Sequence, residues 1–431
     1  MTALALEATL GRVVQVRREE VGALLWSFLY FFCLLAAYYV IRPVRDEMGV
    51  QVGAARLQWL FSAVFVAMIA LVPVFGWLAR RLPVARLLPT VYGFFALSLF
   101  AFYLALESGV ELRQLAPVFF VWVSVFNLFV VSVFWSFMAD LYTTEAARRL
   151  FGFIAAGGSL GAVVGPGLTT LLAPRIGIAN LLLVSTAFLV AAIGCIVALL
   201  RIAASRPDGT SRYLRAPEAE PGARPSLWIG VIRTARSPYL AGICVFLVCY
   251  TLLSTLLYFM QTKLVPEFIP SPERRTQLFA AADLAVNALT LLLQLFATGR
   301  LLSKFGVTLM LAALPAVSVI GFLALGVAAV IPVLIVFGVL RRAGEFAISK
   351  PARETLFTVV TKEEKYQAKN VIDTVIYRGG DAASGWLAAA LLGAGLSLSG
   401  MAFVGVPVAC LWFATAIFLG RRHESMRTAA R

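Results

Sequence analysis

Residues 21–41 read VGALLWSFLYFFCLLAAYYVI, an uncharged stretch of aliphatic and aromatic residues. At a rise of about 1.5 Å per residue, a helix of about 20 residues crosses the hydrocarbon core of a bilayer. The stretch therefore predicts a membrane-spanning helix. It follows a charged amino-terminal segment and is too long and too aromatic for a cleaved signal peptide, so we expect it to remain in the protein.

The composition of the whole chain agrees with this prediction. Of its 431 residues, 61% are hydrophobic and only 14% are charged, whereas soluble domains are roughly half apolar and about a quarter charged. A soluble enzyme, a secreted disulfide-stabilised protein and a disordered chain are excluded. We assign the net charge of +15 to basic cytoplasmic loops and not to nucleic-acid binding. Five cysteines lie in apolar runs, and we interpret them as small hydrophobic residues with no metal or redox role: Cys33, Cys195, Cys244, Cys249 and Cys410.

Further apolar stretches of similar length follow the first. We therefore expect an all-α protein with twelve transmembrane helices, at residues 21–41, 57–79, 87–107, 115–138, 150–173, 179–200, 239–260, 277–299, 306–328, 331–349, 371–396 and 399–420. With the amino terminus inside, 26 of the 37 Lys and Arg residues fall in cytoplasmic segments and 8 in outer loops. This asymmetry predicts a protein of the cytoplasmic (inner) membrane with both termini in the cytoplasm.

The chain also contains an internal repeat. Three pairs of segments match at offsets of 220–223 residues: 76–84 (GWLARRLPV) with 299–307 (GRLLSKFGV), 38–47 with 258–267, and Gly157-Gly158 with Gly379-Gly380. A Pro-, Arg- and Ser-rich stretch at 201–238 predicts a cytoplasmic linker between six-helix bundles at 1–200 and 239–431. Six plus six spans, with a basic turn after the second span of each half, resemble the Major Facilitator Superfamily, whose two bundles rock around a central cavity.

Charged side chains inside membrane spans are costly, so each is a candidate functional residue. Helix length places Arg341, Arg342 and Glu345 of the tenth span roughly 15–20 Å below the surface, near mid-membrane. Arg378 and Asp381 of the eleventh span lie roughly 10–15 Å from the cytoplasmic face. We expect Asn127 and Asn287 at a similar depth.

Two interpretations of these charges remain open. In the first, the charges neutralise one another: Arg341 and Glu345 are four residues apart and share a helical face, and Asp381 pairs with Arg342. In the second, one guanidinium stays available for an anionic substrate, because its planar fork binds phosphate at two points. The excess of arginine at this depth favours the second.

The outer end of the first span carries a further polar group: Tyr38, Arg42, Pro43, Arg45 and Asp46. Arg42 reaches Asp46 four residues on, which leaves Arg45 unpaired. The repeat supplies Lys263 at the corresponding place, so two basic groups at the outer mouth would draw an anion inward. Ordinary snorkelling of basic side chains to the membrane surface is the alternative.

The fifth span contains Gly157, Gly158, Gly161, Gly165 and Gly167. Small residues at four-residue spacing let helices approach closely. The segment 157–167 (GGSLGAVVGPG), which includes Pro166, is similar to the glycine–proline signature of drug/proton antiporters of the facilitator type. The chain has one histidine, His423, and no phosphate-binding loop or catalytic motif, so we expect neither an enzyme nor a cofactor.

Several motifs resemble the ATP/ADP translocases, the nucleotide transporter family of intracellular bacteria and plastids. The matching segments are 42–46 (RPVRD), 134–137 (FWSF), 145–152 (EAARRLFG) and 351–354 (PARE), followed by Lys365, Lys369, Asp373 and Arg378. That family has Arg-Asp-Thr-Lys-Asp, Phe-Trp-Gly-Phe, Glu-Glu-Ala-Lys-Arg-Phe-Tyr-Gly and Pro-Thr-Lys-Glu at these places. This sequence departs from it at Glu345 and Asp381, where lysines are expected, and has no acid at 124–127.

The resemblance implies a secondary transporter that exchanges an anionic, phosphate-bearing metabolite, with nucleotides as the leading class. Arg341 and Arg342 would hold the anion, Arg45 and Lys263 would attract it from outside, and Arg353 and Arg378 would do so from inside. Glu345 and Asp381 would compete for these cations, so that substrate binding releases an internal ion pair, and Asp46 is a further candidate for coupling or gating. We expect a monomer in the lipid bilayer. The alternatives are a proton-coupled exporter of drugs or other amphiphiles, and a membrane receptor or scaffold that does not transport.

Overall fold

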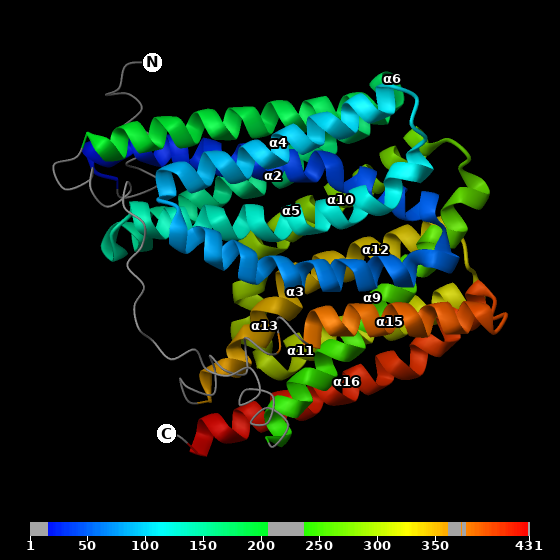
Figure 1. Cartoon of the computed structure of the whole chain (residues 1–431). Helices are drawn as coiled ribbons and strands as arrows, with labels where there is room; N and C mark the ends of the chain where they lie inside the picture. Colours follow the sequence, from blue (N-terminus) through cyan, green and yellow to red (C-terminus); the bar gives the residue numbers. More distant parts are fainter. Residues whose placement is uncertain (1–15, 206–236, 361–371, 373–375, 430–431) are drawn as a thin grey trace. The chain divides into compact units, whose positions relative to one another are not determined.

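The computed structural model describes residues 16–205, 237–360, 372 and 376–429 (Figure 1). The described chain is helical and contains no strand. Its main elements, in chain order, are η1 (Arg18–Glu20), α2 (Val21–Val52), η2 (Ala54–Arg56), α3 (Leu57–Arg81), α4 (Val84–Glu107), α5 (Leu112–Leu141), α6 (Thr144–Ala204), α9 (Pro238–Phe268), α10 (Pro272–Phe296), α11 (Thr298–Val327), α12 (Ile331–Gly344), η3 (Glu345–Ser349), α13 (Lys350–Thr355), η4 (Leu356–Thr358), α15 (Tyr377–Gly393) and α16 (Leu398–Ala429).

Nine helices of the described chain are long and apolar enough to cross a membrane. One of them, α6, is 61 residues long and changes direction at Gly177, whose φ of 77° only glycine adopts readily, so it supplies two of the predicted spans. A further span is the continuous helical run α12–η3–α13 over 331–355, and the last is the 17-residue α15. The twelve spans predicted from the sequence are thus accounted for.

By packing, the chain divides into two compact units. Unit 1 comprises Met1–Gln51, Val66–Glu220 and Ser271–Leu284, and unit 2 comprises Val52–Phe65, Pro221–Pro270 and Ala285–Arg431. Helices α3 and α10 therefore each contribute their first part to one unit and their last part to the other. The bundle boundaries predicted from the sequence stay a prediction, and most of the predicted linker, 206–236, lies outside the described residues.

In unit 1, α6 packs closely against α2, and the glycines of the fifth span make this possible. A Cβ atom on Gly157 would collide with the carbonyl oxygen of Phe28, and one on Gly161 would collide with that of Phe32. At Gly165 it would lie 2.8 Å from the carbonyl oxygen of Ala36. The sequence-based prediction of close helix approach is confirmed. Helix α4 also lies along α6 in unit 1 (Figure 1).

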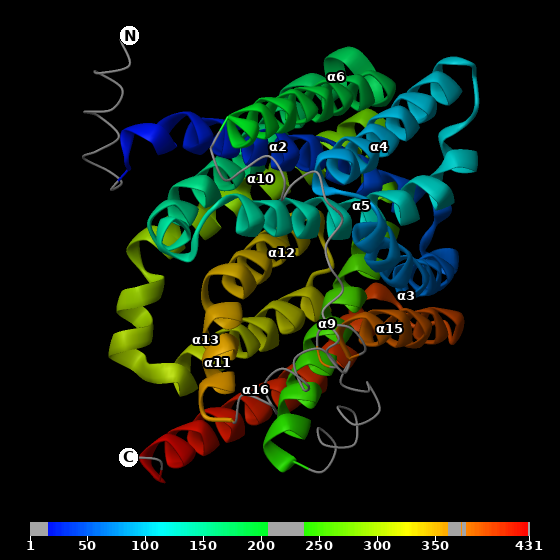
Figure 2. The same ribbon diagram turned by 60° about the vertical axis from the view of Figure 1, so that its left-hand side comes forward.

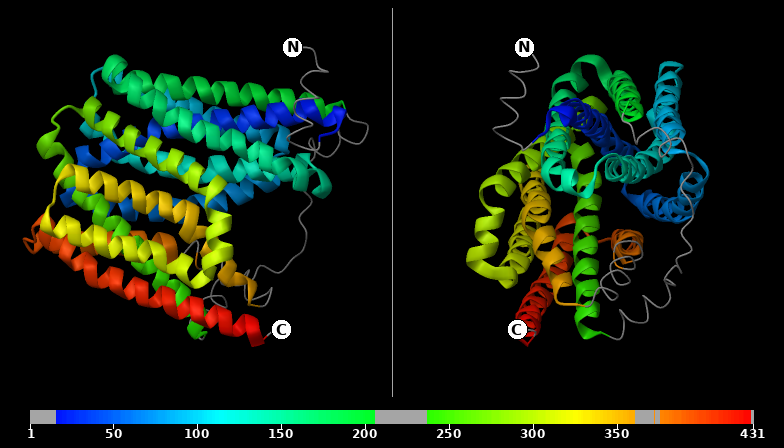
Figure 3. Two further views of the ribbon diagram at one scale, coloured as in Figure 1. Left: turned by 180° about the vertical axis from the view of Figure 1, so that it is seen from behind. Right: turned by 90° about the vertical axis from the view of Figure 1, so that its left-hand side faces the viewer.

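In unit 2, α16 packs along α9 and α11 (Figure 3). Gly306, with a φ of 71°, separates a short first segment of α11 from its membrane-spanning body. Figure 2 shows α12 and α13 following one another along one helical run. This run carries the charged residues of the tenth span.

Candidate functional site

A π-helical segment shapes the charged part of unit 2. Between α12 and α13, the five residues of η3 widen the helix by one residue per turn. This leaves backbone carbonyls displaced from their usual partners, and neighbouring side chains bind two of them. Gln294 Nε2 donates to the Phe346 carbonyl at 3.2 Å, and Thr298 Oγ1 donates to the Ala347 carbonyl at 2.8 Å. Side chains of neighbouring residues therefore stabilise the irregular turn. Such π-helical turns are frequent at functional sites.

The π-helical segment also decides which charges meet. Arg353 Nη1 lies 3.1 Å from Glu345 Oε1, and both side chains are at least nine-tenths buried. The alternative pairing of Glu345 with Arg341, which regular α-helical spacing would give, is not found among the described residues. The wider turn rotates the following helix, so that Arg353 reaches back to the carboxylate. Glu345 Oε2 and the hydroxyl of Ser349 are buried, and within the described chain neither has a hydrogen-bond partner.

Arg341 is the most distinctive residue of this group. It is only 4% exposed, yet its Nε and Nη1 atoms have no hydrogen-bond partner in the described parts of the chain. Its guanidinium carbon lies 5.4 Å from the centre of the Tyr250 ring. The Tyr250 ring lies 6.2 Å from that of Tyr377, and the guanidinium carbon of Arg378 lies 5.6 Å from the Tyr377 ring. Unit 2 thus has two tyrosine rings flanked by two guanidinium groups.

The other predicted residues of unit 2 lie in the same helices. Lys263 of α9, Asn287 of α10, Arg342 of α12 and Asp381 of α15 are half-buried. Arg342, Asp381 and Asn287 each have an interaction partner. Lys365, Lys369 and Asp373, which carry part of the resemblance to the translocases, lie outside the described residues.

In unit 1, the predicted group at the end of the first span is held tightly. The prediction that Arg45 is unpaired is wrong. Its Nε donates to Ser124 Oγ at 3.1 Å, its Nη1 lies 3.3 Å from Asp46 Oδ1, and its guanidinium carbon lies 4.0 Å from the centre of the Phe120 ring. Asp46 is the adjacent residue of α2, whereas Ser124 and Phe120 belong to α5, and the sequence of α2 alone does not show which residues of another helix it contacts.

Arg42 has a partner that the sequence analysis did not name. Its Nη1 lies 3.4 Å from Oδ1 of Asp283, on the part of α10 that belongs to unit 1. The Asp283 side chain is fully buried. Because Asp283 is an acid within a predicted span, its position alone was a signal for a functional or paired residue. Tyr38 of α2 and Asn127 of α5 are half-buried, and the Tyr38 ring lies 6.4 Å from that of Phe126.

A second ion pair joins the same two helices. Arg275 donates through Nε to Glu47 Oε2 at 2.8 Å and through Nη2 to Glu47 Oε1 at 2.6 Å. Gln51 Nε2 adds a third hydrogen bond to Glu47, at 2.7 Å. The predicted topology places Arg275 in an outer loop, and no sequence pattern singles out Glu47. The pair is not visible in the sequence because 228 residues separate the partners.

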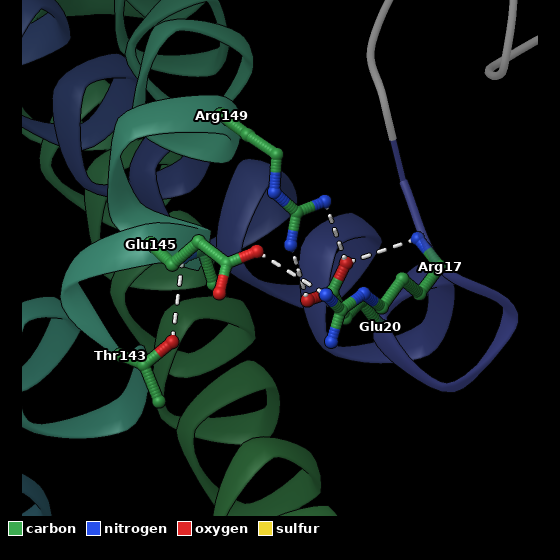
Figure 4. Close-up of polar contacts among 6 residues, drawn as sticks. Arg17, Glu20, Thr143, Glu145 and Arg149 are labelled. Atoms are coloured by element: carbon green, nitrogen blue, oxygen red, sulfur yellow. Dashed lines mark hydrogen bonds and ion pairs between the residues drawn. The ribbon is translucent and has the colours of Figure 1, made fainter.

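A further polar cluster lies at the amino-terminal end of α2, as Figure 4 shows. Arg149 of α6 forms a two-pronged ion pair with Glu20, at 3.2 and 2.9 Å, and the exposed Arg17 contacts Glu145 at 3.2 Å. The Arg17 backbone amide also donates to Glu20, at 2.9 Å. Burial raises the pKa of Glu20, but the bonds and charges of Arg149 and Arg17 outweigh it, so the pKa lies below its usual value. Thr143 Oγ1 caps α6 by accepting from the Ala146 amide.

Solved structures of transporters resemble the chain in fold. A bacterial homologue of the iron transporter ferroportin in its inward-facing state matches with a TM-score of 0.62 and 13% identity, over 94% of this chain and 98% of that one. A POT family transporter in complex with a thioalcohol-conjugated peptide matches with a TM-score of 0.60 and 12% identity, over 94% and 96%. The nucleoside transporter NupG matches with a TM-score of 0.57 and 13% identity, over 95% and 99%.

A comparison with curated proteins finds no match. The sequence profile described as Major Facilitator Superfamily matches residues 13–266, more than half of the chain. Together with the helical architecture, this match identifies the chain as a multi-pass membrane transporter, not an enzyme, that belongs to the Major Facilitator Superfamily.

Proposed function

We propose that the protein is a secondary transporter that exchanges an anionic, phosphate-bearing metabolite, with nucleotides as the first class to test. The observation that carries this proposal is the buried Arg341 with two guanidinium nitrogens that lack partners in the described chain. A buried charge without hydrogen bonds costs several kcal/mol, so a protein keeps one where a ligand compensates it. A phosphate carries several anionic oxygens, which can accept hydrogen bonds from these two guanidinium nitrogens.

The aromatic residues beside Arg341 favour a ligand with a planar ring. Tyr250 and Tyr377 stand between the guanidinium groups of Arg341 and Arg378. Bases stack on tyrosine rings with about 1–3 kcal/mol per base in single-stranded nucleic-acid complexes. A nucleotide combines both features, a base for the rings and phosphates for the cations. The motifs shared with the ATP/ADP translocases support the same class.

Glu345 supplies a mechanism that links binding to the conformational change. Its ion pair with Arg353 is buried, and its second oxygen has no partner in the described chain. A substrate anion that binds Arg353 would compete with this carboxylate. The pair would then open only in the loaded transporter, and the binding energy of the substrate would favour the switch between states.

The remaining predicted residues take supporting roles in this proposal. We assign further substrate contacts to Arg342, Arg378, Asn287, Lys263, Tyr38, Arg42, Arg45 and Asn127. Asp381 acts as a competing carboxylate, and Asp46 acts as a coupling or gating residue. We also propose that the protein resides as a monomer in the cytoplasmic membrane, with both termini in the cytoplasm.

The test uses purified protein in liposomes preloaded with ADP, with uptake of labelled ATP as the readout. Wild-type protein should exchange the two, and Arg341→Ala should abolish uptake. Arg341→Lys keeps the charge but loses the fork, so it should transport with a raised KM. Arg175→Ala is the matched control, because Arg175 is exposed and donates only to the Leu171 carbonyl in the described chain. If a panel of nucleotides neither exchanges nor raises the melting temperature, nucleotides are not the substrate.

A second candidate function is proton-coupled export of drugs or other amphiphiles. The buried carboxylate of Glu345, whose Oε2 has no partner in the described chain, favours it, because acidic residues inside membrane spans are typical of proton-coupled transporters. In this case uptake into inverted vesicles would depend on an imposed pH gradient and not on internal nucleotide. The Glu345→Gln variant would then lose the response to the gradient while still binding substrate.

A further inference from the structure

An apolar groove lies between α3, α4 and α5 of unit 1, on residues that the proposed transport mechanism does not use. Its volume is about 720 Å³, and its lining includes Val74 of α3, Phe94 of α4, and Val118 and Trp122 of α5. Phe94 and Val118 are each 61% exposed, so the groove opens at the surface of the unit. A surface groove on apolar membrane-spanning helices is in contact with hydrocarbon, and this lining suits an acyl chain.

Basic side chains mark one end of this groove. Leu78 of α3 and Thr90 of α4 belong to its lining. Arg81 follows Leu78 by three residues, and Arg86 precedes Thr90 by four, so each lies one helical turn beyond the groove on the same face. Both arginines are exposed. They approach the groove from its two flanking helices, which meet at the turn between them.

An aromatic residue places this end of the groove at the membrane surface. The guanidinium carbon of Arg81 lies 4.5 Å from the centre of the Trp77 ring, and Trp77 is 47% exposed. Tryptophan is enriched at the level of the lipid headgroups, where its ring is apolar and its N–H is wet. The predicted topology places this turn on the cytoplasmic side, where the surface potential of the leaflet is negative.

We infer that this groove is a binding site for an anionic phospholipid. One acyl chain occupies the apolar lining, and the headgroup phosphate lies between Arg81 and Arg86. Two guanidinium groups at the mouth favour a lipid with a net negative charge, because a zwitterionic headgroup brings its own cation to the same place. Each basic residue near a membrane surface contributes about fivefold in affinity for anionic lipid.

Unit 2 offers an internal comparison. A second apolar groove, of about 520 Å³, lies between α11 and α12, and Ala324 belongs to its lining. The connection between these helices, Ala328–Val330, carries no charge. This groove should accept hydrocarbon without preference for the headgroup.

The experiment measures lipid binding to the delipidated protein in detergent by native mass spectrometry. The probes are phosphatidylglycerol and phosphatidylcholine with identical acyl chains. Wild-type protein should bind phosphatidylglycerol more tightly, by about 25-fold for two arginines. Arg81→Gln and Arg86→Gln should each reduce this preference about fivefold, and the double variant should abolish it. Ala67→Trp, which narrows the groove, should weaken both lipids, whereas Ala324→Trp in the second groove should leave the preference intact.

Control variants and a competing anion show how any other outcome is to be interpreted. Arg113→Gln removes an exposed arginine at the start of α5 in the same unit, and it should have no effect. An equal loss in this variant would show a response to overall charge and overturn the proposal, as would equal binding of the two lipids by the wild type. Competition by millimolar inorganic phosphate would assign the arginines to a soluble anion instead. Circular dichroism of each variant separates lost binding from lost folding, and Arg81→Lys, which keeps the charge, should retain the preference in a folded protein.

Discussion

Arg275 and Glu47 form a two-pronged ion pair between helices that are 228 residues apart in the sequence. The Glu47 side chain is fully buried, and that of Arg275 is 7% exposed. This ion pair and the pair of Arg42 with Asp283 are two charged contacts between α2 and the first part of α10. Removing one partner of such a pair leaves an uncompensated charge in a dry environment, which costs more than the pair itself contributes.

The first prediction concerns this pair. Arg275→Met should lower the stability by about 3–5 kcal/mol, because Glu47 then remains buried without its cation. The double variant Arg275→Met/Glu47→Leu should recover most of the loss. The measurement is the melting temperature in detergent. The exposed pair Arg17–Glu145 is the control, and Arg17→Met should cost less than about 1 kcal/mol. Equal losses of stability in Arg275→Met and Arg17→Met would contradict the conclusion that burial makes the Arg275–Glu47 pair the more costly one to break.

The second prediction concerns the ion pair between Glu345 and Arg353. If this carboxylate competes with the substrate, Glu345→Gln should lower the KM for the transported anion several-fold and also lower kcat, because release then becomes slower. Transport assays in proteoliposomes give both constants. Glu107→Gln, a change at an exposed acid at the end of α4, is the matched control. An unchanged KM in Glu345→Gln would rule out competition.

The third prediction concerns the contact of α6 with α2. Gly161→Val should destabilise the protein by about 1–3 kcal/mol or more, because the new side chain meets the backbone of α2 at Phe32 and Ala36. Gly167→Val, in the same helix, should be tolerated, since no atom lies within 4 Å of its added Cβ. Thermal unfolding in detergent compares the two. A similar loss in both variants would show that helix propensity, and not packing, sets the effect.

The fourth prediction concerns pH and Glu20. Its pKa in the folded protein lies below the usual value, so its contribution to stability is complete above the unfolded-state pKa of about 4.3 and is lost as the pH falls through the folded-state value. Glu20→Gln should therefore lower the melting temperature at pH 7, and the difference from wild type should shrink towards pH 3. The exposed neighbour Glu19 provides the control. A difference that stays constant with pH would contradict the ion pair with Arg149.

The sequence predicted the residues of the candidate site better than their partners. Arg341 and Glu345 were identified because a charge within an apolar stretch is visible in the sequence itself, and Arg353 because it lies in a motif (351–354) that resembles the translocases. Regular helical spacing then suggested Arg341 as the partner of Glu345, and the π-helical segment instead brought Arg353 to it. One extra residue in a turn changes which side chains share a face of the helix, and no feature of the local sequence predicts the π-helical turn.

The sequence alone determined that this chain crosses a membrane in twelve helices. The length and continuity of an apolar stretch are local properties of the sequence, and the thickness of the bilayer sets the length that is required. It also predicted the depth of each charge in the membrane, because the rise of a helix per residue is fixed. Only the tertiary structure decided which cation meets which carboxylate. Arg42 with Asp283 and Arg275 with Glu47 depend on how α10 lies against α2, and that arrangement comes from packing between segments that are distant in the sequence.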